Sequence, residues 1–146
     1  MMRSLRLAAV TGSLALLLTS AGLARATDAA PIVIAFVKDC PVLTCEETSA
    51  SPVDVQTVVT PVKLSGWIFH YTAIETFTSA DGSLTVSLSG ILNLAQTPNA
   101  TVLQGVVVEG TWDGVDLSGA RVYAEATRLF DTTFGGSVSI FPASAS

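Results

Sequence analysis

The chain has 146 residues, 49% of them hydrophobic, and its 12 acidic and seven basic residues give a formal net charge of -5. Three of the basic residues, Arg3, Arg6 and Arg25, precede residue 27, which leaves 12 acidic against four basic residues and a net charge of -8. Such a surface repels phosphate backbones and anionic lipids, and this argues against nucleic acids and membrane surfaces as partners. About 120 residues bury roughly two thirds of their unfolded surface, enough for one domain.

Residues 1–26 have the three parts of an export signal. A basic start is followed by an apolar stretch over residues 7–18, and Ala-Arg-Ala at 24–26 fits the small-x-small cleavage pattern. The apolar stretch is too short for a membrane span, which needs about 20 apolar residues. We therefore expect a cleaved signal peptide and a single secreted domain over residues 27–146, extracellular or periplasmic, with no stable membrane insertion after cleavage.

The first expected strand and a cysteine pair follow. Residues 31–37 are a continuous apolar run rich in β-branched side chains, typical of a strand covered on both faces. Cys40 and Cys45 are the only cysteines, and close cysteines pair in an oxidising compartment. A zinc site would need further ligands, and His70 is the only histidine. The sequence predicts a structural Cys40–Cys45 disulfide, with no metal and no cofactor.

Most of the remaining chain alternates apolar and polar residues. In residues 83–95, Leu84, Val86 and Leu88 share one face, a period of two that is typical of antiparallel sheet with one face open to water. Residues 46–52 fit an exposed loop. The further strands expected are 53–59, ended by Pro61, then 63–78, 83–95, 101–112, 117–129 and 132–141.

Short links and glycines within strands set the expected architecture. Links such as Asp113-Gly114 favour consecutive antiparallel neighbours. Glycines at Gly90 and Gly105 mark the bends that curved sheets use to close. We predict an all-β fold, a small antiparallel meander that closes into a β-barrel of about seven or eight strands, with a two-sheet β-sandwich as the alternative.

The strongest local signal is the hairpin at Asp81-Gly82. A two-residue type I′ turn there sets Phe77 opposite Val86 and turns the aromatic side chains, including Trp67, toward the leucines. A three-residue loop reverses every face and turns His70 inward. The first register buries more apolar area, and we favour it.

The favoured register places Glu75 opposite Leu88, inside the apolar face. Burial penalises a charged carboxylate unless it is paired, and Arg128 points inward as a partner. In one interpretation, Glu75 works in the barrel lumen with Tyr71 as acid, base or ligand anchor, and these two are the only catalytic candidates. In the other, which is commoner and which we favour, Glu75 lies at the barrel rim and reaches water. The residues expected to line a ligand cavity are Phe69, Tyr71, Ala73, Glu75, Gly90 and Arg128.

Other patterns carry weaker predictions. Asp113 and Asp116 have the oxygen ligands that calcium prefers, but no further ligands are spaced around them, and turn formation is the explanation that we favour. In the second register the aromatic stripe over residues 67–71 would face outward and stack on sugars, whereas core packing is the commoner use of such residues. Asn99 begins a glycosylation sequon.

The glycine-punctuated strands, including Ser-Gly-Ala-Arg at 118–121 and Thr-Phe-Gly-Gly at 133–136, resemble those of small secreted eight-stranded barrels of the lipocalin-like and allene-oxide-cyclase-like kinds. The resemblance is one of rhythm over about half of the chain, and it carries over no site and no activity.

Three functions are hypotheses at this point. The first is a secreted non-enzymatic β-barrel that binds a small apolar ligand or an extracellular protein partner, because no catalytic motif stands out. The second is an isomerase or cyclase that works in the lumen through Glu75 and Tyr71. The third is an extracellular inhibitor or adhesive module that acts through loops such as 40–45. An unpaired edge of the 31–37 strand would allow dimerisation.

Overall fold

The computed structural model describes residues 30–143, where the chain forms strands and turns. Within this range no helix is long and apolar enough to cross a membrane. The expected signal peptide, residues 1–26, lies outside the described residues. The strands are β1 (Ile32–Asp39), β2 (Thr44–Glu47), β3 (Asp54–Ser65), β4 (Ile68–Ser79), β5 (Gly82–Asn93), β6 (Ala100–Trp112), β7 (Val115–Asp116), β8 (Arg121–Phe130) and β9 (Thr133–Phe141).

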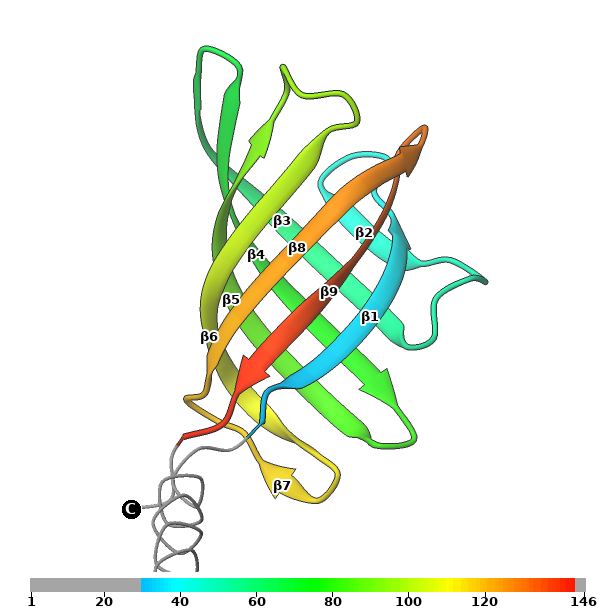
Figure 1. The fold of residues 1–146 in the computed structure, drawn as a ribbon, viewed down its shortest axis with the longest axis vertical. Helices are drawn as coiled ribbons and strands as arrows, with labels where there is room; N and C mark the ends of the chain where they lie inside the picture. Colours follow the sequence, from blue (N-terminus) through cyan, green and yellow to red (C-terminus); the bar gives the residue numbers. More distant parts are fainter. Residues whose placement is uncertain (1–29, 144–146) are drawn as a thin grey trace, which may run out of the picture. The chain divides into compact units, whose positions relative to one another are not determined.

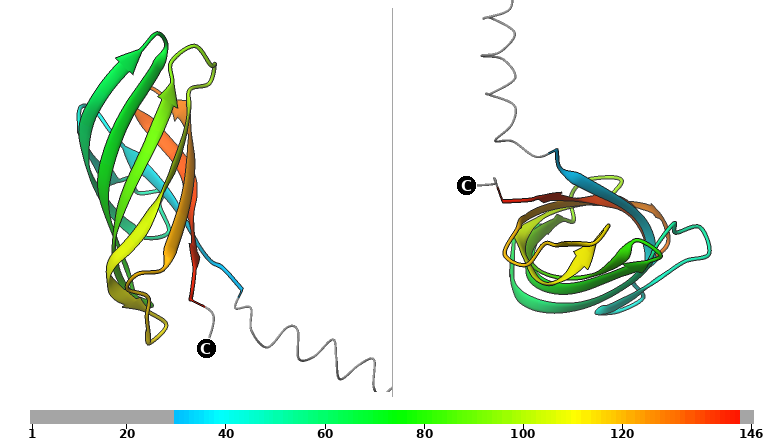
Figure 2. Two further views of the ribbon diagram at one scale, coloured as in Figure 1. Left: turned by 90° about the vertical axis from the view of Figure 1, so that its left-hand side faces the viewer. Right: turned by 90° about the horizontal axis from the view of Figure 1, so that it is seen from below.

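Eight of these strands form a closed antiparallel ring. Their order is β5-β4-β3-β2-β1-β9-β8-β6, and pairing of β5 with β6 closes the ring (Figure 1). β7 pairs only with β6 and lies outside the ring. The predicted all-β barrel is therefore confirmed, and the sandwich alternative is wrong. Figure 2 shows the ring end-on.

The barrel interior is packed with apolar side chains at the end that carries β7. Phe77, Leu84 and Val86 are completely buried there, as their alternation predicted. Seen from below, β7 and its turns lie across this end (Figure 2), and the flanking Trp112 and Leu117 are buried in the same core cluster. This end of the barrel is therefore filled by side chains.

The β4–β5 hairpin has neither of the expected registers. Its turn consists of residues 80–81, and Phe77 pairs with Leu84. The shift from the favoured register is two residues, so each side chain keeps its expected face. Gly82 belongs to β5 because a neighbouring strand passes close to it: a Cβ at this position would lie 2.1 Å from the carbonyl oxygen of Thr111.

The type I′ geometry forms at the second Asp-Gly pair instead. Asp113 and Gly114 have φ values of 51° and 76°, and a type I′ turn needs positive φ at both central residues. The turn joins β6 to β7, which the sequence did not predict as a separate strand.

Three expected features near β2 and β3 are wrong. Residues 44–47 form β2, although much of this segment was expected to be loop. β3 does not end at Pro61, because a register shift between Pro61 and Lys63 lets the strand pass the residue that lacks an N–H. Trp67 does not join the inward aromatics: it lies in the β3–β4 turn and is 68% exposed.

Strand β1 has different neighbours along its two sides. It pairs with β9 over its whole length, from Ile32 to Asp39. On the other side its ladder pairs with β2 are at Lys38 and Asp39. Dimerisation through the 31–37 segment therefore stays a prediction.

Candidate functional site

A cavity of about 190 Å³ lies at the end of the barrel opposite β7. It is surrounded by the β1–β2 loop and by the ends of β4, β5, β6, β8 and β9 that lie on that side. Apolar side chains form most of its wall, among them Phe36, Val59, Phe69, Leu92, Leu103 and Phe134. The polar side chains on the wall are Lys38, Thr57, Tyr71, Glu75, Thr101 and Arg128.

The sheet register builds one wall of this cavity from three neighbouring strands. Cys45 of β2 pairs with Thr57 of β3, and Thr57 pairs with Glu75 of β4. Residues paired directly across strands point to the same face, and all three are buried. The period of two that buries Phe77 thus also buries Glu75, two residues earlier on the strand.

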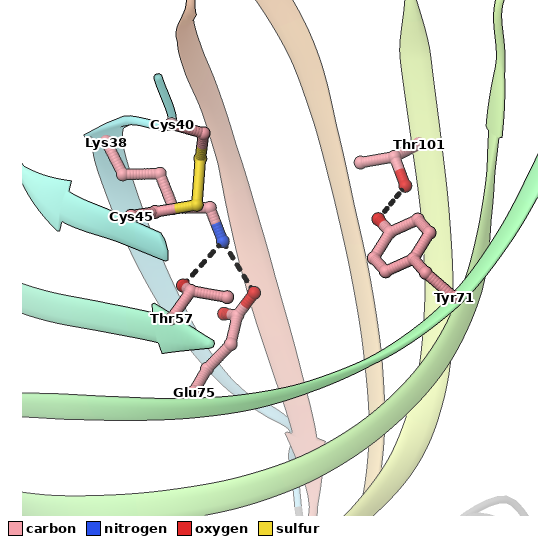
Figure 3. A network of polar contacts seen from close by, with 7 residues as sticks. All are labelled: Lys38, Cys40, Cys45, Thr57, Tyr71, Glu75 and Thr101. Atoms are coloured by element: carbon pink, nitrogen blue, oxygen red, sulfur yellow. Dashed lines mark hydrogen bonds and ion pairs between the residues drawn. A yellow bond between two sulfur atoms is a disulfide. The ribbon is translucent and has the colours of Figure 1, made fainter. Parts of the chain in front are cut away.

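Glu75 forms an ion pair inside the barrel. The Nζ atom of Lys38 lies 2.5 Å from Glu75 Oε1 and also donates to Thr57 Oγ1 at 3.0 Å (Figure 3). The side chains of Lys38 and Glu75 are only 9% and 2% exposed. The rim position that we favoured for Glu75 is therefore wrong, and its cation is Lys38 rather than Arg128. The second carboxylate oxygen, Oε2, is buried with no hydrogen-bond partner among the described residues.

The predicted disulfide is present beside this ion pair. Cys40 and Cys45 are bonded, and both line the cavity (Figure 3). Their short loop carries Val42 and Leu43, which also contribute to the wall. The disulfide thus holds one lip of the cavity next to the Lys38 ammonium group.

Tyr71 faces the ion pair from another part of the wall. Its hydroxyl is hydrogen-bonded with that of Thr101 (Figure 3). The Thr101 hydroxyl in turn donates to the carbonyl oxygen of Ile91 at 2.7 Å. Burial raises the pKa of Tyr71 to about 12; the charge of Glu75 adds to this rise, and the Thr101 hydroxyl opposes it. Tyr71 therefore stays a neutral phenol at any physiological pH. Its ring stacks on that of Phe69, with the centroids 5.5 Å apart.

Arg128 is the second cation of the cavity. Its guanidinium carbon lies 5.4 Å from the centroid of the Phe134 ring, within the range of a cation–π interaction. Its Nε atom is buried and has no hydrogen-bond partner in the part of the chain that the structure describes. Arg128 thus has an aromatic neighbour and a donor that no group among residues 30–143 accepts from.

The structure brings four of the six predicted cavity residues together on this wall: Phe69, Tyr71, Glu75 and Arg128. Ala73 and Gly90 do not line the cavity. The space expected beside Gly90 is occupied, since a Cβ there would lie 2.6 Å from Leu103 Cγ. Whether any of the six contacts a ligand stays a prediction.

Sequence reasoning missed Lys38, Thr57 and Thr101. Lys38 continues the alternation of Ile34 and Phe36, which are both buried, so extending the first strand by one residue would have placed the lysine inside. Thr101 likewise precedes the buried Leu103 by two residues. The alternation of buried positions thus indicated an inward direction for Lys38 and Thr101, but polar residues were not expected in the barrel interior.

The other residues singled out in the sequence, Asp116, His70 and Asn99, do not line this cavity. Asp116 accepts hydrogen bonds from the backbone N–H and the hydroxyl of Ser118, and these two bonds lower the pKa of its carboxyl. No group of three or more potential metal ligands occurs within residues 30–143. His70 follows Phe69 on the opposite face of β4. The Asn99 amide donates to the carbonyl oxygens of Asn93, at the end of β5, and of Gln96, in the β5–β6 loop.

Comparison with known proteins yields no relative, because the chain matches no protein family, no curated protein and no solved structure. The function has to be argued from the cavity itself.

Proposed function

We propose that this protein is a secreted, non-enzymatic β-barrel that binds a small, largely apolar molecule in the cavity at its disulfide end. The observation that carries the proposal is a cavity of about 190 Å³ with a mainly apolar wall and a few fixed polar groups, the usual composition of a ligand pocket. An apolar cavity of about 150 Å³ is enough to bind benzene. A single ring or a short alkyl chain is the expected size of the ligand.

Two features favour binding over catalysis. A general acid or base works best when its pKa lies near the working pH, and that of Tyr71 is raised to about 12. Glu75 is held by Lys38 at 2.5 Å. An isomerase or cyclase that uses Glu75 and Tyr71 remains the alternative, because both side chains line the same cavity.

The loop 40–45 supports the same preference. An inhibitor or adhesive module would present an exposed loop above a filled interior. Val42 and Leu43 are exposed, at 78% and 40%, but they border a cavity instead of a filled interior. The disulfide is compatible with an oxidising location outside the cytosol, as expected for an exported chain. A protein partner at this end stays an alternative to a small ligand.

Titration with toluene and with hexanol, followed by backbone NMR shifts of protein recovered after export of the full chain, tests the proposal. We expect saturable shifts at cavity residues such as Tyr71 and Ala126. Ala126→Met fills part of the cavity and should abolish them. Ala95→Met places the same side chain on an exposed turn and should preserve them. Absence of saturable shifts, or equal shifts in both variants, would refute the cavity as the binding site.

A further inference from the structure

The charges that line the cavity do not balance. Lys38 and Arg128 are the cations on the wall and Glu75 is the acid, so the cavity carries one excess positive charge. The excess contrasts with the whole chain, whose formal net charge is -5. A cation at an apolar site inside an acidic protein is not explained by solubility.

The ion pair assigns the excess charge to Arg128. Lys38 and Glu75 neutralise each other at 2.5 Å. Arg128 has no carboxylate within ion-pair distance among residues 30–143. Its Nε–H is buried without an acceptor, and leaving a buried donor unused costs free energy. An acceptor that enters the cavity would relieve this cost.

The sheet register places the two cations on one wall with an aromatic ring between them. Arg128 of β8 pairs with Phe134 of β9, and Phe134 pairs with Lys38 of β1. Neighbouring strands lie about 4.8 Å apart, so the backbones at Arg128 and Lys38 are separated by roughly 10 Å. An apolar body of ring size can rest against Phe134 with one end at the guanidinium group.

We propose, building on the proposed function, that the ligand is an amphipathic monoanion: its carboxylate or similar oxyanion pairs with Arg128, and its apolar body fills the cavity. A guanidinium fork is suited to two parallel hydrogen bonds with a carboxylate. Lys38 is already paired with Glu75, and Arg128 is the cation on the wall with no carboxylate partner among residues 30–143, so a second negative charge would have no counter-charge in the cavity. The pocket therefore favours one anionic group over two.

The test compares probes that differ only in charge. Benzoate and hexanoate are titrated beside benzamide and hexanamide by calorimetry, at neutral pH and low salt, on protein recovered after export. We expect the anions to bind about tenfold more tightly than the amides, as for one charge-assisted contact. Arg128→Gln should abolish this preference while the amides still bind. Arg121→Gln is the matched control, because Arg121 stacks on Phe141 at the same 5.4 Å distance but does not line the cavity.

A second readout does not depend on the variant folding. The Nε–H resonance of Arg128 in the unaltered protein should shift on saturation with benzoate and move less with benzamide. Equal binding of benzoate and benzamide, or a preference that survives Arg128→Gln, overturns the anion inference but leaves the cavity proposal intact. Failure of all four probes to bind overturns both.

Discussion

Replacing Glu75 by glutamine leaves the Lys38 ammonium group buried without its counter-charge. Removing one partner of a buried ion pair typically costs about 3–5 kcal/mol, because the remaining charge is uncompensated. The 9% and 2% exposed side chains of Lys38 and Glu75 place this pair in that class. The loss is a large part of the 5–15 kcal/mol that stabilises a typical domain. We expect Glu75→Gln to lower the free energy of unfolding by about 3 kcal/mol.

The assay is urea unfolding followed by tryptophan fluorescence. Trp112 is buried in the core and reports the loss of packing, whereas Trp67 is already exposed in the folded state. With a denaturant slope of about 2 kcal/mol per molar urea, the midpoint should fall by about 1.5 M. Glu125→Gln makes the same change on the barrel exterior and should alter stability by about 0.5 kcal/mol or less.

A double variant separates coupling from simple damage. Lys38→Met together with Glu75→Leu removes both charges, and replacing a buried pair by apolar groups is often close to neutral. The hydroxyl of Thr57 then loses its donor, so we expect a residual loss of about 1–2 kcal/mol. Two results would contradict a buried, coupled ion pair. One is a loss of stability in Glu75→Gln no larger than that in Glu125→Gln. The other is a loss in the double variant equal to the sum of the losses in Lys38→Met alone and Glu75→Leu alone.

Two further predictions concern the interior and the strand spacing. The pKa of Tyr71 is raised from 10.0 to about 12, so the unfolded state loses this proton first and stability should fall between about pH 10 and pH 12, by roughly 3 kcal/mol relative to Tyr71→Phe. Unfolding of the wild type and of Tyr71→Phe at alkaline pH measures this difference in stability, and Tyr123→Phe serves as the control. Parallel pH profiles of stability for the wild type and Tyr71→Phe would contradict the raised pKa of Tyr71. Gly105→Ala should cost about 3 kcal/mol in thermal unfolding, because its Cβ would lie 1.8 Å from the carbonyl oxygen of Ser87. Gly66→Ala, which has open space but a φ of +59°, should cost only about 1 kcal/mol, and equal losses would show that strand contact is not the reason.

The sequence was sufficient for the fold class and for the inward face of β4. A period of two is a local property, so the inward direction of Tyr71 and Glu75 followed from the positions of their neighbours. The depth of Glu75 did not follow: it was expected at the rim, and it is buried. The strand β2 was not predictable in this way, since four residues are too few to show alternation. Its existence depends on pairing with β3 at Cys45 and Thr57.

The composition of the site was harder to predict than its location. Lys38 and Glu75 are 37 residues apart in the sequence, and the local sequence around each residue does not indicate that the two form a pair. Two strands, β2 and β3, lie between β1 and β4 in the sheet, and the two side chains meet inside the barrel. The prediction of the hairpin register was wrong for a related reason. Gly82 is needed because Thr111 of β6 lies close to it, and residues 78–83 alone give no sign of that contact.

The first and the last strands of the described chain, β1 and β9, are neighbours in the ring. β1 pairs with β9 from Ile32 opposite Ile140 to Asp39 opposite Thr133. Until β9 joins the sheet, the facing sides of β1 and β8 are unpaired edges and the apolar inner face is open. Such edges are prone to pair with other chains, and long-range pairing is slow. Correct folding therefore requires β9 to join β1 and β8 before either edge pairs with another copy of the chain.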